Sequence, residues 1–137
     1  MIDSRLLFAA LAIAGSPLAA QEAAPEAPLS VALDAADQVE TACRLTFVAR
    51  NEAEAGVEAL VIETVAFDLD GGVSRIALFD FGALPAGLPR VRQFDLPDTD
   101  CAALSSLLVN GVQTCEGGEA CEMPPSVSSR IDLELLG

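Results

Sequence analysis

The stretch Cys43–Arg50, CRLTFVAR, indicates the fold of this chain more clearly than any other. Apolar residues alternate with mostly polar or charged ones, which is the two-residue period of a strand that buries one face. The residues expected on the buried face are Cys43, Leu45, Phe47 and Ala49. The opposite face carries Arg44 and Arg50. A strand with one apolar face needs a second layer to cover it.

Short segments of the same kind follow one another along the chain, separated by turn signals. The expected strands are 29–33, 43–50, 57–69, 73–81, 90–96, 104–114 and 130–135. The sequence Asp70-Gly71-Gly72 suits the positive φ of a hairpin turn between the third and fourth strands, and 82–89 is a Pro/Gly loop. Asn110-Gly111 is a turn signal inside the sixth segment, which is therefore either bulged there or divided into two short strands.

Only two short windows have a sequence compatible with helix. Residues 34–39 are predicted to form a single turn capped by Asp34, and 52–55 are predicted to lie in a loop. Without long amphipathic helices between the strands, the chain is predicted to be all-β. The expected architecture is an immunoglobulin-like antiparallel β-sandwich of about seven strands. A small β-barrel is the alternative, because the number of strands does not separate the two.

The N-terminal residues 1–20 have the features of a secretory signal sequence. Arg5 precedes an apolar run over 6–14, and the small residues Ala19 and Ala20 supply a cleavage site. The run is too short to span a membrane, which takes about 20 apolar residues. Residues 21–28, QEAAPEAP, are expected to be a flexible leader, and 29–137 a single domain. The predicted location is the periplasm or the outside of the cell, with no membrane span after signal removal.

Four cysteines in an exported chain favour disulfide bonds over free thiols. In a seven-strand sandwich the second and sixth strands run in the same direction. Cys43 opens the second strand and Cys101 leads into the sixth, so both lie at one end of the sandwich. Cys115 and Cys121 flank a short Gly-containing loop. The predicted pairs are therefore Cys43 with Cys101 and Cys115 with Cys121.

The charge balance and the missing residue types exclude several classes of function. The chain has 7 Lys+Arg against 21 Asp+Glu, no His, and a formal net charge of −14; all the basic residues are Arg. This balance argues against nucleic acid, whose phosphates need a basic surface. The lack of His, Lys and Tyr removes the usual general bases and the most common zinc ligand. The sequence predicts a protein without enzymatic activity and without a cofactor.

Acidic residues in two predicted turns supply an alternative function. They are Asp68, Asp70, Asp95, Asp98 and Asp100. Carboxylate oxygens bind Ca²⁺, so these loops could bind a divalent cation or a small ligand. Hydrogen bonding of Asp side chains to their own turns explains the same residues more simply. Hydrolysis by paired carboxylates is the least favoured function, because the chain lacks the Trp and Tyr that usually bind sugars.

Two arginines are the main candidates for recognition. Arg90 and Arg92 lie two residues apart, and so on one face of a strand, next to the loop 84–89. They would bind an anionic ligand or a partner's carboxylate, or else pair with Asp and Glu of this chain. The leading hypothesis is a non-catalytic interaction or accessory module that uses this surface to contact a protein of the cell envelope.

Three segments of the chain are distinctive: CRLTFVARN (43–51), ETVAFD (63–68) and LFDFGALPAGLPRVRQFDLP (78–97). VNG (109–111) lies between the second and third cysteines. Together these features resemble a family of small exported proteins from alphaproteobacteria. Members are often labelled Tat-pathway signal sequence domain proteins. This chain lacks the twin arginine of that pathway. The resemblance implies export and assigns no catalytic or binding residue.

Overall fold

The computed structural model describes residues 12–17 and 26–137, and the second range contains the folded domain. Most of the predicted signal sequence and leader, residues 1–11 and 18–25, lies outside the described residues. The domain contains eight strands and two short 3-10 turns. These are β1 (Leu29–Val39), β2 (Ala42–Asn51), β3 (Val57–Asp68), β4 (Val73–Leu84), β5 (Arg90–Leu96), η1 (Cys101–Ala103), β6 (Leu104–Glu116), η2 (Glu119–Cys121), β7 (Ser126–Ser129) and β8 (Glu134–Leu136).

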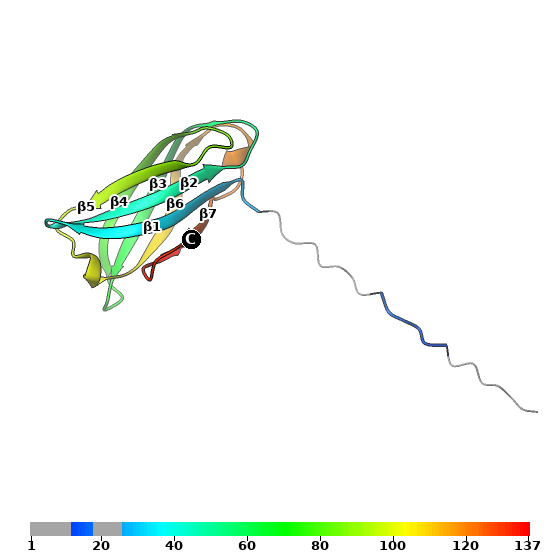
Figure 1. The fold of residues 1–137 in the computed structure, drawn as a ribbon, viewed down its shortest axis with the longest axis horizontal. Coiled ribbons are helices and arrows are strands. Elements are labelled where there is room, and N and C mark those ends of the chain that lie inside the picture. The colour runs from blue at the N-terminus through cyan, green and yellow to red at the C-terminus, as the bar shows by residue number, and fades with distance from the viewer. Residues whose placement is uncertain (1–11, 18–25) are drawn as a thin grey trace, which may run out of the picture.

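The strands form two four-stranded sheets. Figure 1 shows that the two layers lie face to face. Sheet A has the order β5-β2-β1-β7, and sheet B has the order β4-β3-β6-β8. The first six strands are neighbours in the same order as in an immunoglobulin domain. In sheet A, β1, β2 and β5 correspond to the immunoglobulin strands A, B and E. In sheet B, β3, β4 and β6 correspond to strands C, C′ and F. The predicted β-sandwich is confirmed, and the barrel alternative is not adopted.

The last two strands depart from the predicted antiparallel arrangement. β7 pairs in parallel with β1, and β8 pairs in parallel with β6. The final strand predicted over 130–135 is wrong for 130–133, where the chain crosses from sheet A to sheet B, and only 134–135 belong to a strand, β8. The Ser129 hydroxyl holds this crossing, because it donates to the Leu133 carbonyl (2.6 Å) and accepts from the Ile131 amide (3.3 Å). Ile131 and Leu133 pack against the core without forming a strand, whereas Leu135 lies in β8.

Residues 34–39 extend β1, so the predicted helical turn is wrong. They pair with β2, from Ala35 opposite Thr46 to Val39 opposite Ala42. Asp34 lies at a register shift in this ladder, and its carboxylate forms an ion pair with Arg130 at 3.4 Å. Pairing with a neighbouring strand outweighs the weak helix preference of such a short segment.

The sixth strand is bulged, which settles the ambiguity at Asn110-Gly111. Its ladder with β3 shifts register between Val109 and Gly111 and again between Val112 and Thr114. A bulge adds one residue to a strand and increases its local twist. β6 therefore continues as one strand past the Asn-Gly pair.

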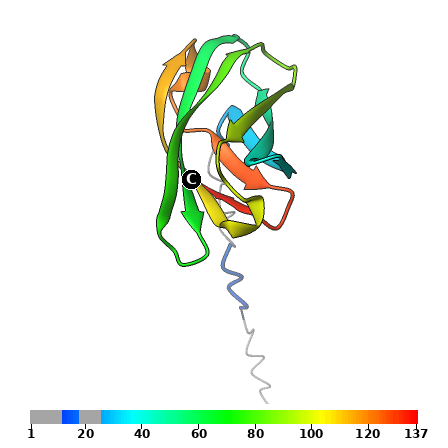
Figure 2. The same ribbon diagram turned by 90° about the vertical axis from the view of Figure 1, so that its left-hand side faces the viewer.

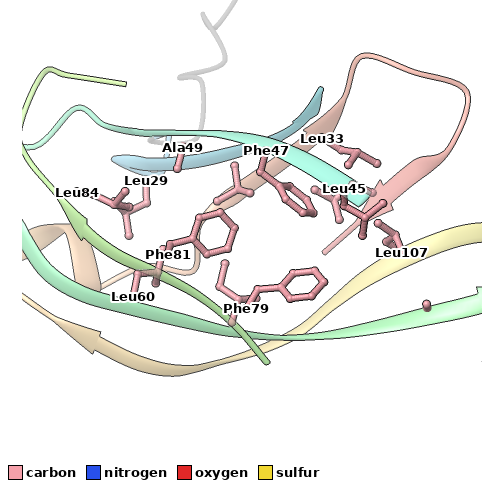
Figure 3. Packing of buried hydrophobic residues seen from close by; sticks show 14 of the residues in the cluster. Leu29, Leu33, Leu45, Phe47, Ala49, Leu60, Phe79, Phe81, Leu84 and Leu107 are labelled. Carbon is pink, nitrogen blue, oxygen red and sulfur yellow. The ribbon is translucent and has the colours of Figure 1, made fainter. Parts of the chain in front are cut away.

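Phenylalanines of both sheets meet in the core (Figure 3). Phe47 of sheet A has its ring centroid 5.7 Å from both Phe79 and Phe81 of sheet B, and 5.9 Å from Phe94. Phe47 is 2% exposed. The face predicted to be buried in 43–50 is therefore the buried face, and the large aromatic side chains join the two layers.

Both predicted disulfides are present. Cys43 and Cys101 join the start of β2 to η1, immediately before β6, so this bond links the two sheets. Cys115 and Cys121 join β6 to η2. Disulfides are typical of proteins that fold in oxidising compartments. In the described part of the chain, no helix has the length and apolar character needed to cross a bilayer.

The two disulfides should contribute unequally to stability. They close loops with sequence separations of 58 and 6 residues. The loop-entropy relation gives about 4 kcal/mol for the longer loop and about 2 kcal/mol for the shorter. We expect Cys43→Ala with Cys101→Ala to lower the free energy of unfolding in urea about twice as much as Cys115→Ala with Cys121→Ala. Equal losses, or the reverse order, would contradict the larger role of the bond between the sheets.

Phe47 should be the most costly aromatic side chain to remove. Phe47→Ala takes away a ring that contacts three others and should lower the free energy of unfolding by about 3–5 kcal/mol. The matched control is Val91→Ala, since Val91 is 59% exposed on β5 and should change stability by less than about 0.5 kcal/mol. Urea denaturation followed by far-UV circular dichroism measures both.

Candidate interaction surface

The two candidate arginines lie on β5 and face the edge of β4. Arg92 donates from Nε to the Phe81 carbonyl (2.7 Å) and from Nη2 to the Ala83 carbonyl (3.3 Å). Arg90 donates to the carbonyl of Pro89 (3.2 Å). Within the described ranges, the ion pairs are Arg44–Asp95 and Arg130–Asp34, so the alternative that Arg90 and Arg92 pair with acidic side chains is not realised. Arg92 instead bridges the edges of the two sheets.

The loop beside these arginines is held by a buried asparagine. Asn51 is 1% exposed and donates from Nδ2 to the carbonyls of Leu84 (3.1 Å) and Ala55 (2.9 Å). The backbone carbonyl of Asn51 accepts from the backbone amide of Gly87 (2.8 Å). A buried amide with these partners makes the loop a fixed part of the sandwich. Nothing in the sequence pattern singled out Asn51.

A bidentate ion pair lies on the outer face of sheet A. Arg44 donates from Nε to Oδ1 of Asp95 (2.8 Å) and from Nη2 to Oδ2 (3.0 Å). The hydrogen bond from Arg44 is the main cause that lowers the pKa of the Asp95 carboxyl; desolvation opposes this shift, and the charge of Arg44 adds to it. Asp95 therefore lies in a strand and has a partner, rather than belonging to an acidic loop.

Two of the other acidic residues, Asp68 and Asp100, serve their own turns. The Asp68 carboxylate accepts from the amides of Asp70 and Gly72, each at 3.0 Å, in the predicted β3–β4 hairpin turn, which projects at one end of the sandwich in Figure 2. Asp100 caps η1 by accepting from the Ala102 amide (3.0 Å). Within residues 12–17 and 26–137, no three His, Cys, Asp or Glu side chains come together as a metal site requires.

The outer face of sheet A is mostly polar. Arg44 lies opposite Asp95, and Thr46 lies opposite Gln93, which donates to its hydroxyl at 3.1 Å. Farther across the sheet, Arg50 is opposite Ser30, and Ser30 is next to Ser126 of β7. A sandwich sheet with one face in solvent is expected to have this composition.

The outer face of sheet B is apolar along a complete row of strands. Ile76, Val65, Leu108 and Leu136 occupy directly paired positions on β4, β3, β6 and β8. Ile76 is 61% exposed and Leu136 is 45% exposed, while Val65 between them is covered by its neighbours. The row therefore presents its apolar side chains to solvent at both edges of the sheet.

Further apolar side chains widen this row. Leu78 lies two residues beyond Ile76 on the same face of β4 and is 53% exposed. On the other side, Val73 is 58% exposed and lies opposite Phe67. We call these seven residues the apolar face. They are Val65, Phe67, Val73, Ile76, Leu78, Leu108 and Leu136.

A groove opens between the two sheets beside β6. It has a volume of about 380 Å³ and lies next to the Cys115–Cys121 disulfide. Its lining is predominantly apolar and includes Leu29 of sheet A, Leu60 and Val112 of sheet B, and Met123. The sequence carried no signal for this groove, because it forms where the final strands fail to cover β6.

Comparison of the chain with models of known protein families, with curated proteins and with solved structures found no match. The resemblance to exported alphaproteobacterial proteins therefore remains a prediction from the quoted segments. The candidate surfaces are defined by geometry alone: the Arg90–Arg92 edge, the apolar face and the groove. Of these, the apolar face departs most from what a solvent-facing sheet should carry.

The Arg44–Asp95 pair makes a testable prediction about pH. Because the pKa of Asp95 is lowered on folding, the pair stabilises the fold above the ordinary Asp pKa, and this contribution is lost as the pH falls through the lowered value. Arg44→Gln should raise the Asp95 titration midpoint toward its ordinary value, followed by carboxyl chemical shift in NMR. Arg130→Gln is the control and should leave Asp95 unchanged. An unmoved Asp95 midpoint in Arg44→Gln would refute Arg44 as the cause of the lowered pKa.

Proposed function

We propose that this chain is an exported, non-catalytic domain that binds a protein of the cell envelope through the apolar face of sheet B. The observation that carries the proposal is the row of Ile76, Val65, Leu108 and Leu136 across all four strands of that sheet. Contiguous exposed apolar patches are uncommon on monomeric proteins and mark interaction sites.

The opposite sheet supports this assignment because it serves as an internal comparison. Both sheets belong to one sandwich and have one face in solvent. Sheet A carries polar pairs over most of its solvent face, such as Arg44–Asp95 and Thr46–Gln93, and its exposed valine, Val91, lies opposite Val48. Sheet B instead carries a row of aliphatic side chains across the equivalent face, with Glu63 and Asp80 beside it, and a partner protein would remove this row from water.

Export is the second part of the proposal. Two disulfides are present in the domain, and the sequence of residues 1–20 has the features of a secretory signal. The resemblance to exported alphaproteobacterial proteins favours the same location. For a Gram-negative cell that location is the periplasm or the outside of the cell.

A binding role suits the side-chain chemistry better than catalysis. The chain has no His, Lys or Tyr to act as a general base. Several of its acidic side chains are committed to structure, including Asp68 and Asp100 in turns and Asp95 in an ion pair. Because of these bonds we favour protein binding over the alternatives of ligand binding by the acidic loops and of hydrolysis.

The Arg90–Arg92 surface is a weaker candidate for the same role. Arg92 uses its guanidinium to hold the carbonyls of Phe81 and Ala83. A partner's carboxylate would have to compete with these bonds. Arg90 and the loop 85–89 could extend the binding surface, and charge reversal at Arg90 tests this extension separately.

The experiment is site-specific photo-crosslinking in cells that export the protein. A photoreactive phenylalanine analogue placed at Leu78 should form an adduct with one envelope protein. The same analogue at Gln93, which is exposed on the outer face of sheet A, is the control and should not form it. Ile76→Asp combined with the analogue at Leu78 should abolish the adduct and change stability by less than about 0.5 kcal/mol. Identical adducts from Leu78 and Gln93, or none from Leu78, would refute the proposal.

A further inference from the structure

The groove beside β6 lies along a strand edge that no other strand covers. β8 pairs only with Ser106, Leu107 and Leu108 of β6. Beyond Leu108, no described residue forms a ladder with that edge of β6. In an immunoglobulin domain strand G occupies this place, antiparallel to F. In this chain the C-terminal segment divides its pairing between β1 and β6, and the stretch 109–116 is left open on one side.

The other lateral opening of the sandwich is closed by side chains. The rings of Phe79 and Phe94 stack between β4 and β5 with centroids 4.4 Å apart. Arg92 covers the carbonyls of Phe81 and Ala83 on the β4 edge. Protected edges of this kind are a common defence against pairing with other chains. Among the described residues, no strand pairs with the edge of β6 beyond Leu108, and the Cys115–Cys121 disulfide and Gly137 line the groove beside it.

The shape and lining of the groove suit an extended chain. Backbone N–H and C=O groups at a strand edge pair with the main chain of an added strand, and alternate side chains of that strand point between the sheets. There they would meet apolar groups. The lining residues that provide these groups are Leu29, Leu60, Val109, Val112, Met123 and Pro124.

The bulges of β6 limit the length of such pairing. Regular ladder positions opposite β3 remain at Gly111 and Val112 and again from Thr114 to Glu116. An added strand would follow these two runs and lose alignment between them. The occupant is therefore a short segment, held as much by side chains in the groove as by its backbone.

Charge decides the chemistry of the occupant. Glu122 lines the groove, and Glu116 is exposed at the end of β6. In the described part of the chain, no arginine lines the groove. With a net charge of −14, the protein attracts basic segments and repels acidic ones. A second copy of this acidic chain is disfavoured, and so is its own leader QEAAPEAP, which carries two glutamates and two prolines.

We propose that this groove binds a short extended segment of a partner protein, with alternating apolar and basic residues, which adds as a strand to the β6 edge. This site is separate from the apolar face and does not depend on it. The apolar face lies on the outside of sheet B, whereas the groove lies between the sheets.

The test uses a short synthetic peptide of alternating valine and arginine with the full disulfide-bonded protein. Binding should slow hydrogen exchange of backbone amides between Val109 and Glu116 by about tenfold or more. A peptide of alternating valine and glutamate should bind on the order of tenfold more weakly at low salt. The arginine peptide methylated at every backbone nitrogen should lose the protection, because it cannot donate hydrogen bonds to β6.

Matched variants place the site. Val112→Arg puts bulk and positive charge into the groove and should abolish protection, whereas Val91→Arg, at an exposed apolar position on β5, should bind as the unaltered protein does. Val112 is 39% exposed, so its replacement should leave the fold intact, and crosslinking from Leu78 should persist. No protection at millimolar peptide, protection along β4 or β5 instead, or equal binding of the methylated peptide would each overturn the proposal.

Discussion

The packing of Phe47 against Phe79 and Phe81 across the two sheets determines which side of each strand faces solvent. Because side chains alternate along a strand, an inward Phe47 places Arg44 and its neighbours of the same parity outside. An inward Phe79 likewise sends Leu78 and Ile76 of β4 to the outer face. The polar face of sheet A and the apolar face of sheet B thus follow from one interlayer contact. A shift of β4 by one residue would expose its phenylalanines and bury its aliphatic side chains.

Sequence periodicity predicted the strands whose inner and outer faces differ in character. It succeeded for Cys43–Arg50, and the end-of-sandwich argument paired Cys43 with Cys101 correctly. It failed for 34–39, where an Ala- and Asp-containing stretch shows no clear period and becomes a strand only through its ladder with β2. It also failed for 130–133, where the alternation of apolar and polar residues reflects packing at a crossing between the sheets. In both places tertiary pairing outweighed the local pattern.

The candidate surfaces were harder to predict than the fold. β4 is apolar on both faces at its centre, since Ile76 and Leu78 alternate with Ala77 and Phe79. A two-sided apolar strand normally lies buried between layers, so the pattern alone does not show that one side stays exposed. The apolar residues of both faces were visible in the sequence of this strand. Only the sheet order, which leaves β4 at an edge, shows that one of the two faces is exposed. The groove beside β6 depends on pairing of the last residues and had no local signal.

The strong negative charge of the chain offsets the risk that comes with an exposed apolar surface, because the charge and the apolar surface affect association with different molecules. An apolar face alone would favour association of identical copies, whereas a net charge of −14 makes that association repulsive at low salt. The same charge increases the encounter rate with a basic partner. Negative charge therefore acts as a selective element, because it opposes self-association without covering the aliphatic row of Ile76, Val65, Leu108 and Leu136. Glu122 lines the groove, so negative charge favours basic partners at the edge of β6 as well as at the outer face of sheet B.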